Sequence, residues 1–439
     1  MIYRLLAYWI SFVFPTFYKR IQIRNKHWLM GREPAIIAIN HPNAFTDPVG
    51  LCFIMYPERF WFLARGDVFK PGLISRLLDS IGIIPIYRMT ESGKAGLMKN
   101  DATYQKVNHH LGRREKVIVF AEGICVMERR LRPLKKGVAR MVFGAYESIP
   151  NREELLVIPV GVNYSQPDKF RSTLFYNVGE PIRVKDFLKD RNDSPAKIQN
   201  AFLQHLEPRL KELITHITEE KNDLLVLQAE ELFKADILHS RGKKDRDLWE
   251  DYQVLKEITE KINSASEFHP EQLEAFRVCS EAYFNSLKKH RLRDWLIKPS
   301  TQYKVKYPMF ILRVLLLGLG LPLFAAGFLF NAIPDRTTFF LTKKVVRTIE
   351  FYSSFVIAFA MPVFLFYYII LYALLYTALH MPWLSLVLLI GAMFCGWFSL
   401  YFISEFRKAS STWRLLRNHS LFRTLKQQRQ ELEILFNKI

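Results

Sequence analysis

The stretch Ala-Ile-Ile-Ala-Ile-Asn at residues 35–40 is a short apolar run that ends on a polar residue. A strand buried on both faces of a parallel sheet has this pattern, because helices cover both faces of such a sheet. Similar runs follow at 59–64, 83–86, 117–121 and 157–163. Helix signals lie between these runs: Pro48, Pro71, a polar stretch over 94–113, and residues 137–147. The alternation predicts an α/β domain with a central, mostly parallel sheet.

The composition is that of a folded protein with a membrane-associated part. Of the 439 residues, 50% are hydrophobic, 14% are aromatic and 24% are charged, which excludes a disordered chain. The apolar residues crowd into the last third and the first two dozen positions, so we expect a soluble-type domain attached to a membrane. The cysteines lack paired spacing, which argues against a disulfide framework or a zinc site and favours a reducing compartment. They are Cys52, Cys125, Cys279 and Cys395.

The net charge indicates an anionic partner. Lys and Arg number 62 against 42 Asp and Glu, a surplus of +20. Phosphates, nucleic acid and lipid headgroups all suit such a surplus. Much of it flanks apolar segments, and no motif for reading a nucleic-acid groove is present, so we expect a lipid bilayer as partner and no nucleic acid.

The first 17 residues predict a helix in the membrane interface. Ile2 to Phe17 is apolar and aromatic, shorter than the roughly 20 residues of a membrane span, and basic residues follow it. The alternative is an amphipathic helix packed on the next domain. Residues 185–306 are polar, rich in Glu, Lys and Leu, and predict helices with one apolar stripe. They contain no catalytic spacing.

A membrane region is predicted over 307–403, followed by a basic cytoplasmic tail at 404–439. Its apolar stretches at 309–333, 351–379 and 383–402 are each long enough to cross a bilayer. The last two form a helical hairpin. The first either spans or re-enters with a turn at Pro322, and the positive-inside rule favours the re-entrant form because it keeps the basic clusters on one side.

The chemistry is predicted in the segment from Asn40 to Pro48, which begins at the carboxyl end of the first buried strand. Ligands of α/β sheets bind at this edge. His41 can act as a general base whose ring is oriented by Asp47, as in the His-Asp half of a hydrolase triad. The structural alternative makes Asp47 a helix N-cap before Pro48 and His41 a turn residue.

Later strands also end on polar residues. Arg88 follows the run at 83–86, where it can bind a phosphate or be a surface cation. Glu122 and Gly123 follow the run at 117–121, where they can serve the site or form a capped turn. A basic stretch then leads into a helix whose amino end favours anions. This stretch contains Arg129, Arg130, Arg132, Lys135, Lys136 and Arg140.

Together and in this order, these segments resemble the glycerophospholipid acyltransferase family, which includes bacterial 1-acylglycerol-3-phosphate acyltransferase. The family pattern is an Asn-His-x-Ser-x-x-Asp block, a strand ending in Arg, a Phe-Pro-Glu-Gly block and a Val-Pro-Val strand. The matching positions are Asn40, His41 and Asp47; Arg88; Phe120, Glu122 and Gly123; and Ile158, Pro159 and Val160. The resemblance covers about residues 18–184, and Gly179 to Ile182 looks like the family's closing strand.

The departures from the pattern point to one branch of the family. Five residues instead of four separate His41 from Asp47, Ala121 replaces Pro, and Ile124-Cys125 replaces Thr-Arg. With the Leu-Arg-Pro-Leu-Lys-Lys-Gly segment at 131–137, they look more like the fungal glycerol-3-phosphate and dihydroxyacetone-phosphate acyltransferases. That branch also has membrane segments after the catalytic domain.

The resemblance implies direct acyl transfer without an acyl-enzyme. His41 and Asp47 are then catalytic, and the donor is a thioester of acyl-CoA or acyl-carrier protein. The acceptor is glycerol-3-phosphate or its 1-acyl form, in phospholipid biosynthesis. The residues expected to bind substrate are Arg88, Glu122, Gly123, Arg130, Lys135 and Lys136. No metal and no cofactor besides the thioester is required.

Two further expectations concern class and place. The rival function is a non-catalytic membrane scaffold or lipid-transfer protein on a degenerate acyltransferase domain, suggested by the altered block from Ala121 to Cys125. We expect an integral membrane protein with its catalytic domain on the cytoplasmic face, in the bacterial inner membrane or, in a eukaryote, the endoplasmic reticulum.

Overall fold

A computed structural model of the chain describes residues 2–439 except 67–68, 70–71, 88–99, 189–192, 243–246 and 299–306. The described chain divides into two compact units. The first contains Met1–His216, Arg246–Lys256 and Val346–Ile357, and the second contains the remainder. The first unit holds the sheet, and the second is helical.

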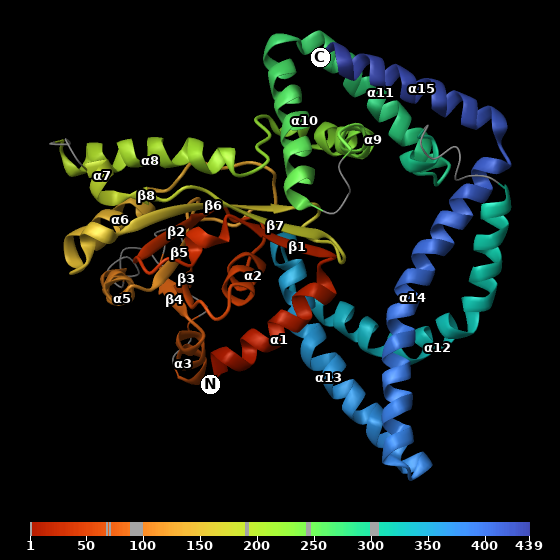
Figure 1. Cartoon of the computed structure of the whole chain (residues 1–439), viewed down its shortest axis with the longest axis horizontal. Helices are drawn as coiled ribbons and strands as arrows, with labels where there is room; N and C mark the ends of the chain where they lie inside the picture. Colours follow the sequence, from red (N-terminus) through yellow and green to blue (C-terminus); the bar gives the residue numbers. More distant parts are fainter. Residues whose placement is uncertain are drawn as a thin grey trace. The chain divides into compact units, whose positions relative to one another are not determined.

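The first unit is built on one mixed sheet with the strand order β1-β7-β6-β2-β5-β3-β4 (Figure 1). The predicted apolar runs form five strands, and all their mutual pairings are parallel. The five strands are β2 (Ala35–Ile39), β3 (Phe60–Arg65), β4 (Ile83–Ile86), β5 (Lys116–Phe120) and β6 (Leu156–Tyr164). The predicted α/β class and mostly parallel sheet are therefore confirmed.

The central strand β2 explains why the run is apolar throughout. All five of its residues are fully buried, between β5 on one side and β6 on the other. Ile36 and Ala38 belong to a core shared with α5 (Asn100–Gly112), α6 (Lys136–Ser148) and α8 (Pro195–Glu212). Each parallel strand needs a crossover, and these helices supply the cover that the apolar face requires.

The edge of the sheet escaped sequence-based prediction. β1 (Arg20–Arg24) pairs parallel to β7 (Thr173–Val178), and β7 runs antiparallel to β6. β1 alternates charged or polar with apolar residues, which is the pattern of a half-buried edge strand. The two-residue strand β8 (Ile182–Arg183) begins at the last residue of the expected closing segment and pairs with β6.

Helix α1 (Ile2–Phe17) packs by one face and leaves an apolar stripe open. Tyr3 contacts the short helix α2 (Thr46–Ile54), since its hydroxyl donates to the carbonyl of Cys52 at 3.4 Å. Leu5, Tyr8 and Phe12, spaced to lie on one side, are 71%, 61% and 70% exposed. The helix thus packs on the neighbouring domain by one face, as the amphipathic-helix alternative predicts, and also has an exposed apolar face that suits a membrane interface.

The second unit confirms the helical region and revises the tail. Its long helices include α9 (Asp223–Ser240) and α11 (Pro270–Lys289). The residues of the predicted basic tail form the end of α14 (Pro382–Leu416) and α15 (His419–Lys438). The ring of Phe436 stacks on Phe233, and buried Arg429 pairs with Asp294 at 3.1 Å, so the terminal helix is part of the helical core.

In the part of the chain that the structure describes, three helices are long and apolar enough to cross a membrane, and the protein is a membrane protein by this measure. They are α12 (Tyr307–Val345), α13 (Tyr352–Leu379) and α14. A turn of two residues joins α13 to α14, as expected, and the hairpin itself stays a prediction. The preferred prediction for 309–333, a segment that re-enters with a turn at Pro322, is wrong. Helix α12 is continuous through Pro322 and bends without turning back (Figure 1). A proline removes one hydrogen bond and kinks a helix without having to end it.

Close packing of α12 on α14 depends on small residues. A Cβ placed on Gly327 would collide with the carbonyl oxygen of Cys395 and the hydroxyl of Ser399, both on α14. In a bilayer, where lipid is as apolar as the helices, such close backbone contact is the main source of helix association.

We expect Gly327→Val to lower the stability of the membrane helices by about 1–3 kcal/mol, the usual cost of overpacking. Gly391→Val is the matched control, because a Cβ at Gly391 meets nothing within 4 Å. Thermal unfolding of both variants in the same detergent is the measurement. Equal unfolding temperatures for the two would contradict the packing described.

Candidate active site

The site is centred on a histidine and a buried carboxylate at the carboxyl end of β2. His41 is the second residue after β2, and Asp47 lies in the first turn of α2. Nδ1 of His41 lies 2.9 Å from Oδ2 of Asp47. An imidazole that donates from Nδ1 has its lone pair on Nε2, which is the form a general base needs. The structure therefore brings the two predicted catalytic residues together.

The Asp47 side chain is completely buried and depends on its donors. Its Oδ2 also accepts from the backbone N–H of Asn43 at 2.8 Å, and its Oδ1 accepts from the hydroxyl of Tyr164 at 2.7 Å. Burial raises the pKa of the Asp47 carboxyl, while the hydrogen bonds from His41, Tyr164 and Asn43 oppose that rise. The donors thus favour a carboxylate that can orient the imidazole.

Neighbouring strands hold the histidine in place. The ring of His41 stacks on Phe120 at the end of β5, with centroids 3.7 Å apart. The Asn40 side chain bonds twice to the backbone of Val162 on β6, accepting at 2.7 Å and donating at 3.1 Å. The Asn40 amide thus extends the pairing of β2 with β6 by one step, and this fixes the backbone from which His41 projects.

Glu122 connects the histidine to the basic stretch. One carboxylate oxygen accepts from the backbone N–H of His41 at 3.1 Å, and the other accepts from the N–H of Arg132 at 2.9 Å. Gly123 has φ 66°, which favours glycine, and this turn sends the chain back toward the site. Burial raises the pKa of Glu122 to about 7. In this position Glu122 holds two backbone segments together, and its expected part in substrate binding stays a prediction.

The basic stretch returns to the end of β5. The N–H of Lys135 donates to the carbonyl of Ala121 at 2.9 Å, and α6 begins at the next residue. The side chains of Lys135 and Lys136 are exposed, at a helix amino end that favours anions. Arg130 is more enclosed and pairs with Glu128 at 3.8 Å. Arg88 lies outside the described residues.

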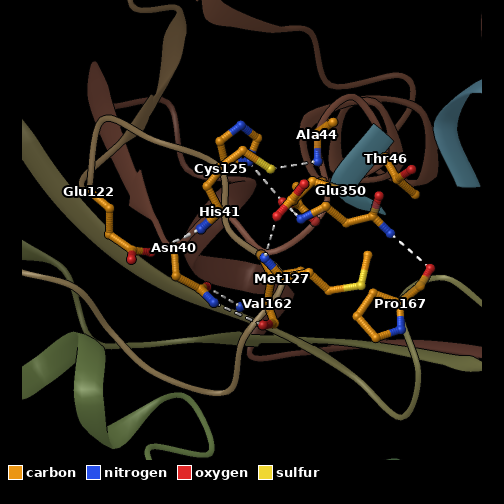
Figure 2. Close-up of polar contacts among 12 residues, drawn as sticks. Asn40, His41, Ala44, Thr46, Glu122, Cys125, Met127, Val162, Pro167 and Glu350 are labelled. Atoms are coloured by element: carbon orange, nitrogen blue, oxygen red, sulfur yellow. Dashed lines mark hydrogen bonds and ion pairs between the residues drawn. The ribbon is translucent and has the colours of Figure 1, made fainter. Parts of the chain in front are cut away.

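Two residues of the site, Tyr164 and Cys125, make contacts that the sequence analysis did not predict. Tyr164 ends the strand that holds the Val-Pro-Val match, and its hydroxyl could have been anticipated as a partner for the first block. Cys125 replaces the expected arginine, and its sulfur accepts from the N–H of Ala44 at 3.0 Å (Figure 2). Among the described residues, no cluster of His, Cys, Asp and Glu is arranged to hold a metal ion.

The comparisons agree with the geometry. The Acyltransferase family matches residues 20–163. The chain is 26% identical over 217 residues to glycerol-3-phosphate O-acyltransferase 1 of Saccharomyces cerevisiae, covering 49% of this chain and 27% of that protein. It is 33% identical over 131 residues to glycerol-3-phosphate O-acyltransferase 2 of the same yeast, covering 30% and 17%. The chain thus matches only about a quarter or less of the length of these relatives.

A solved structure is also similar in part. It is the 1-acyl-sn-glycerophosphate (LPA) acyltransferase PlsC from Thermotoga maritima, with a TM-score of 0.33 and 13% identity over 47% of this chain and 78% of that one. The parallel sheet with a His-Asp pair at its carboxyl edge and the family match define an acyltransferase domain. The match covers the part of the chain that holds most of the sheet and the His-Asp pair, and this part is therefore similar to the Acyltransferase family.

The raised pKa of Glu122 predicts a pH dependence of stability. Because its pKa rises from 4.5 to about 7, the folded protein binds more protons than the unfolded chain between these values. The contribution of this group to stability is therefore present below pH 4.5 and is lost as the pH rises through 7, by about 1–3 kcal/mol in total.

We expect Glu122→Gln to flatten this pH dependence, whatever its effect on absolute stability. Thermal unfolding at pH 5, 6, 7 and 8 measures the slope, and Glu180→Gln is the control because Glu180 is exposed. A wild-type slope in the Glu122 variant would show that the carboxyl is ionised across the range.

Proposed function

We propose that this protein transfers a fatty acyl group from a thioester donor, acyl-CoA or acyl-carrier protein, to a hydroxyl of a glycerol-phosphate acceptor. The observation that carries the proposal is the pair formed by His41 Nδ1 and Asp47 Oδ2 at 2.9 Å, at the carboxyl edge of the sheet. The names of the two yeast relatives favour glycerol-3-phosphate as the acceptor, ahead of its 1-acyl form and dihydroxyacetone phosphate.

The reaction follows from general-base chemistry. Nε2 of His41 takes the proton of the acceptor hydroxyl as its oxygen attacks the thioester carbonyl. Asp47 stabilises the imidazolium that forms. The tetrahedral intermediate collapses, the carbon–sulfur bond breaks, and the leaving thiolate receives the proton from His41. The products are an ester and a free thiol, so no acyl-enzyme and no redox step is involved.

The acceptor phosphate is proposed to bind at the amino end of α6. Lys135 and Lys136 expose their side chains there, next to the turn that contains Glu122 and Gly123. Arg130 and Arg88 are proposed as further cations of the same site. Because acyl-CoA and acyl-carrier protein are cytoplasmic thioesters, the domain is proposed to face the cytoplasm.

His41→Ala is expected to lower the rate of acyl transfer by about 10²- to 10⁴-fold, since the general base is lost. Asp47→Asn is expected to cost nearly as much through the wrong imidazole tautomer. Membranes containing the protein are given labelled acyl-CoA with each of the three acceptors, and products are separated by chromatography. His239→Ala, an exposed histidine of α9, is the control. Wild-type turnover in the His41 variant would overturn the assigned mechanism, whereas no turnover in the wild-type protein would favour the scaffold or lipid-transfer alternative.

Lys135→Ala/Lys136→Ala is expected to raise the KM for the phosphorylated acceptor by about tenfold, the effect of losing roughly 1.4 kcal/mol of binding. The KM for the acyl donor changes less, because the contact is made to the acceptor in ground and transition states alike. Lys197→Ala, an exposed lysine of α8, controls for the loss of surface charge. Equal effects on both substrates would assign the lysines to general attraction of anions.

A further inference from the structure

A segment about 300 residues downstream belongs to the same unit as the catalytic pair. Val346–Ile357 follows α12, includes the start of α13, and is part of the first unit. The described residues of α12 and the remainder of α13 belong to the second unit. It contains the short helix η7 (Ile349–Phe351) and the first turns of α13. In sequence it consists of the end of a linker and the start of the apolar stretch at 351–379, and it contains no motif.

Two consecutive serines of this segment bond to the loop between His41 and Asp47. The hydroxyl of Ser353 donates to Oδ1 of Asn43 at 2.8 Å, and the hydroxyls of Ser354 and Thr46 are 2.9 Å apart. Ser353 is fully buried and Ser354 is 9% exposed. These hydrogen bonds are therefore shielded from water, which makes them costly to lose.

Asn43 connects the first of these serines to the carboxylate. Its backbone N–H donates to Oδ2 of Asp47 at 2.8 Å, the same oxygen that accepts from His41. Its side-chain Nδ2 donates to the carbonyl of Pro167 at 3.0 Å (Figure 2). Each of these polar groups has a partner, so the orientation of the Asn43 amide is determined. Without the Ser353 hydroxyl, Oδ1 of Asn43 would lose its donor while remaining buried. The loop is then expected to shift toward a geometry in which this oxygen has another partner.

Two more contacts come from this segment, one to the same loop and one to the turn beside it. The ring of Phe351 meets Phe45 edge to face, with centroids 6.0 Å apart. The carboxylate of Glu350 accepts from the N–H of Met127 at 3.5 Å, and Met127 follows the turn whose Cys125 sulfur holds Ala44. The segment thus supports both the catalytic loop and the turn beside it.

We propose that the amino end of α13 is a positioning element for acyl transfer, in which Ser353 and Ser354 fix the loop at 43–46 and thereby the alignment of Asp47 and His41. Neither serine touches a substrate in this proposal. A consequence is that a helix long and apolar enough to cross a membrane is part of the working site. The proposal rests on the acyl transfer proposed above, and its test separates the two.

The test compares Ser353→Ala, Ser354→Ala and the double variant in the full-length protein, with glycerol-3-phosphate and labelled acyl-CoA. The double variant is expected to lower kcat by about 10- to 100-fold, the scale of a small misplacement of catalytic groups. KM for both substrates is expected to stay within about twofold. Ser385→Ala is the matched control, since Ser385 is a fully buried serine at the start of α14 that bonds only within its own helix among the described contacts.

A second measurement checks the path through Asn43. In an Asn43→Ala background the hydrogen bond from Ser353 to the Asn43 side chain is already absent. Adding Ser353→Ala to this background is therefore expected to lower kcat by less than twofold. If Ser353→Ala lowers kcat by the same factor in the wild-type protein and in the Asn43→Ala variant, the proposed path through Asn43 is overturned, because a merely structural serine acts independently of Asn43. Ser353→Thr, which keeps the hydroxyl, is expected to retain more of the rate than Ser353→Ala.

The outcomes distinguish this proposal from the function it rests on. If wild-type protein transfers no acyl group to any glycerol-phosphate acceptor, the proposed function fails. If wild type is active, His41→Ala is inactive and the double serine variant keeps the wild-type kcat, the positioning proposal alone is overturned. If the double variant is not recovered as folded protein, the single variants are measured in its place, and wild-type kcat in both overturns the proposal.

Discussion

The burial of one carboxylate constrains most of the first unit. Asp47 is completely enclosed, and an ionised carboxylate there is stable only when donors surround it. Its donors come from three places: the ring of His41, the N–H of Asn43, and the hydroxyl of Tyr164 at the end of β6. The sheet order places β6 beside β2, so the donor from the late strand reaches the early loop. The order of the strands is therefore necessary to keep the Asp47 carboxylate ionised beside His41.

The same constraint explains the number of contacts that hold the loop. Asn40 is clamped to β6, Glu122 binds the N–H of His41, and the serines at the start of α13 bond to the loop itself. Short polar loops are poor at holding one geometry, because each residue gains little from burial. The necessary order comes from groups that are distant in sequence. In the mechanism proposed above, stability and catalysis thus depend on the same hydrogen bonds.

This distribution also decides what the sequence could reveal. Strands β2 and β6 were predictable because burial on two faces produces continuous apolar runs, and His41 and Asp47 because ligands collect at the carboxyl edge. Ser353 gave no signal, since its partner lies 310 residues away and no local pattern encodes such a contact. The turn expected at Pro322 was wrong because a charge rule for topology does not decide whether a helix bends or breaks.

The altered turn after Glu122 is consistent with a shift of the anion-binding groups. The position at which the family pattern has an arginine is Cys125, and burial raises the pKa of its thiol, so the sulfur is neutral and can accept from the N–H of Ala44. The carboxylate of Glu350 also raises the pKa of this thiol. A phosphate gains nothing from a neutral sulfur beside a carboxylate. In the function proposed above, the cations therefore come from elsewhere, and the amino end of α6, with exposed Lys135 and Lys136 and a favourable helix dipole, is the place proposed for them.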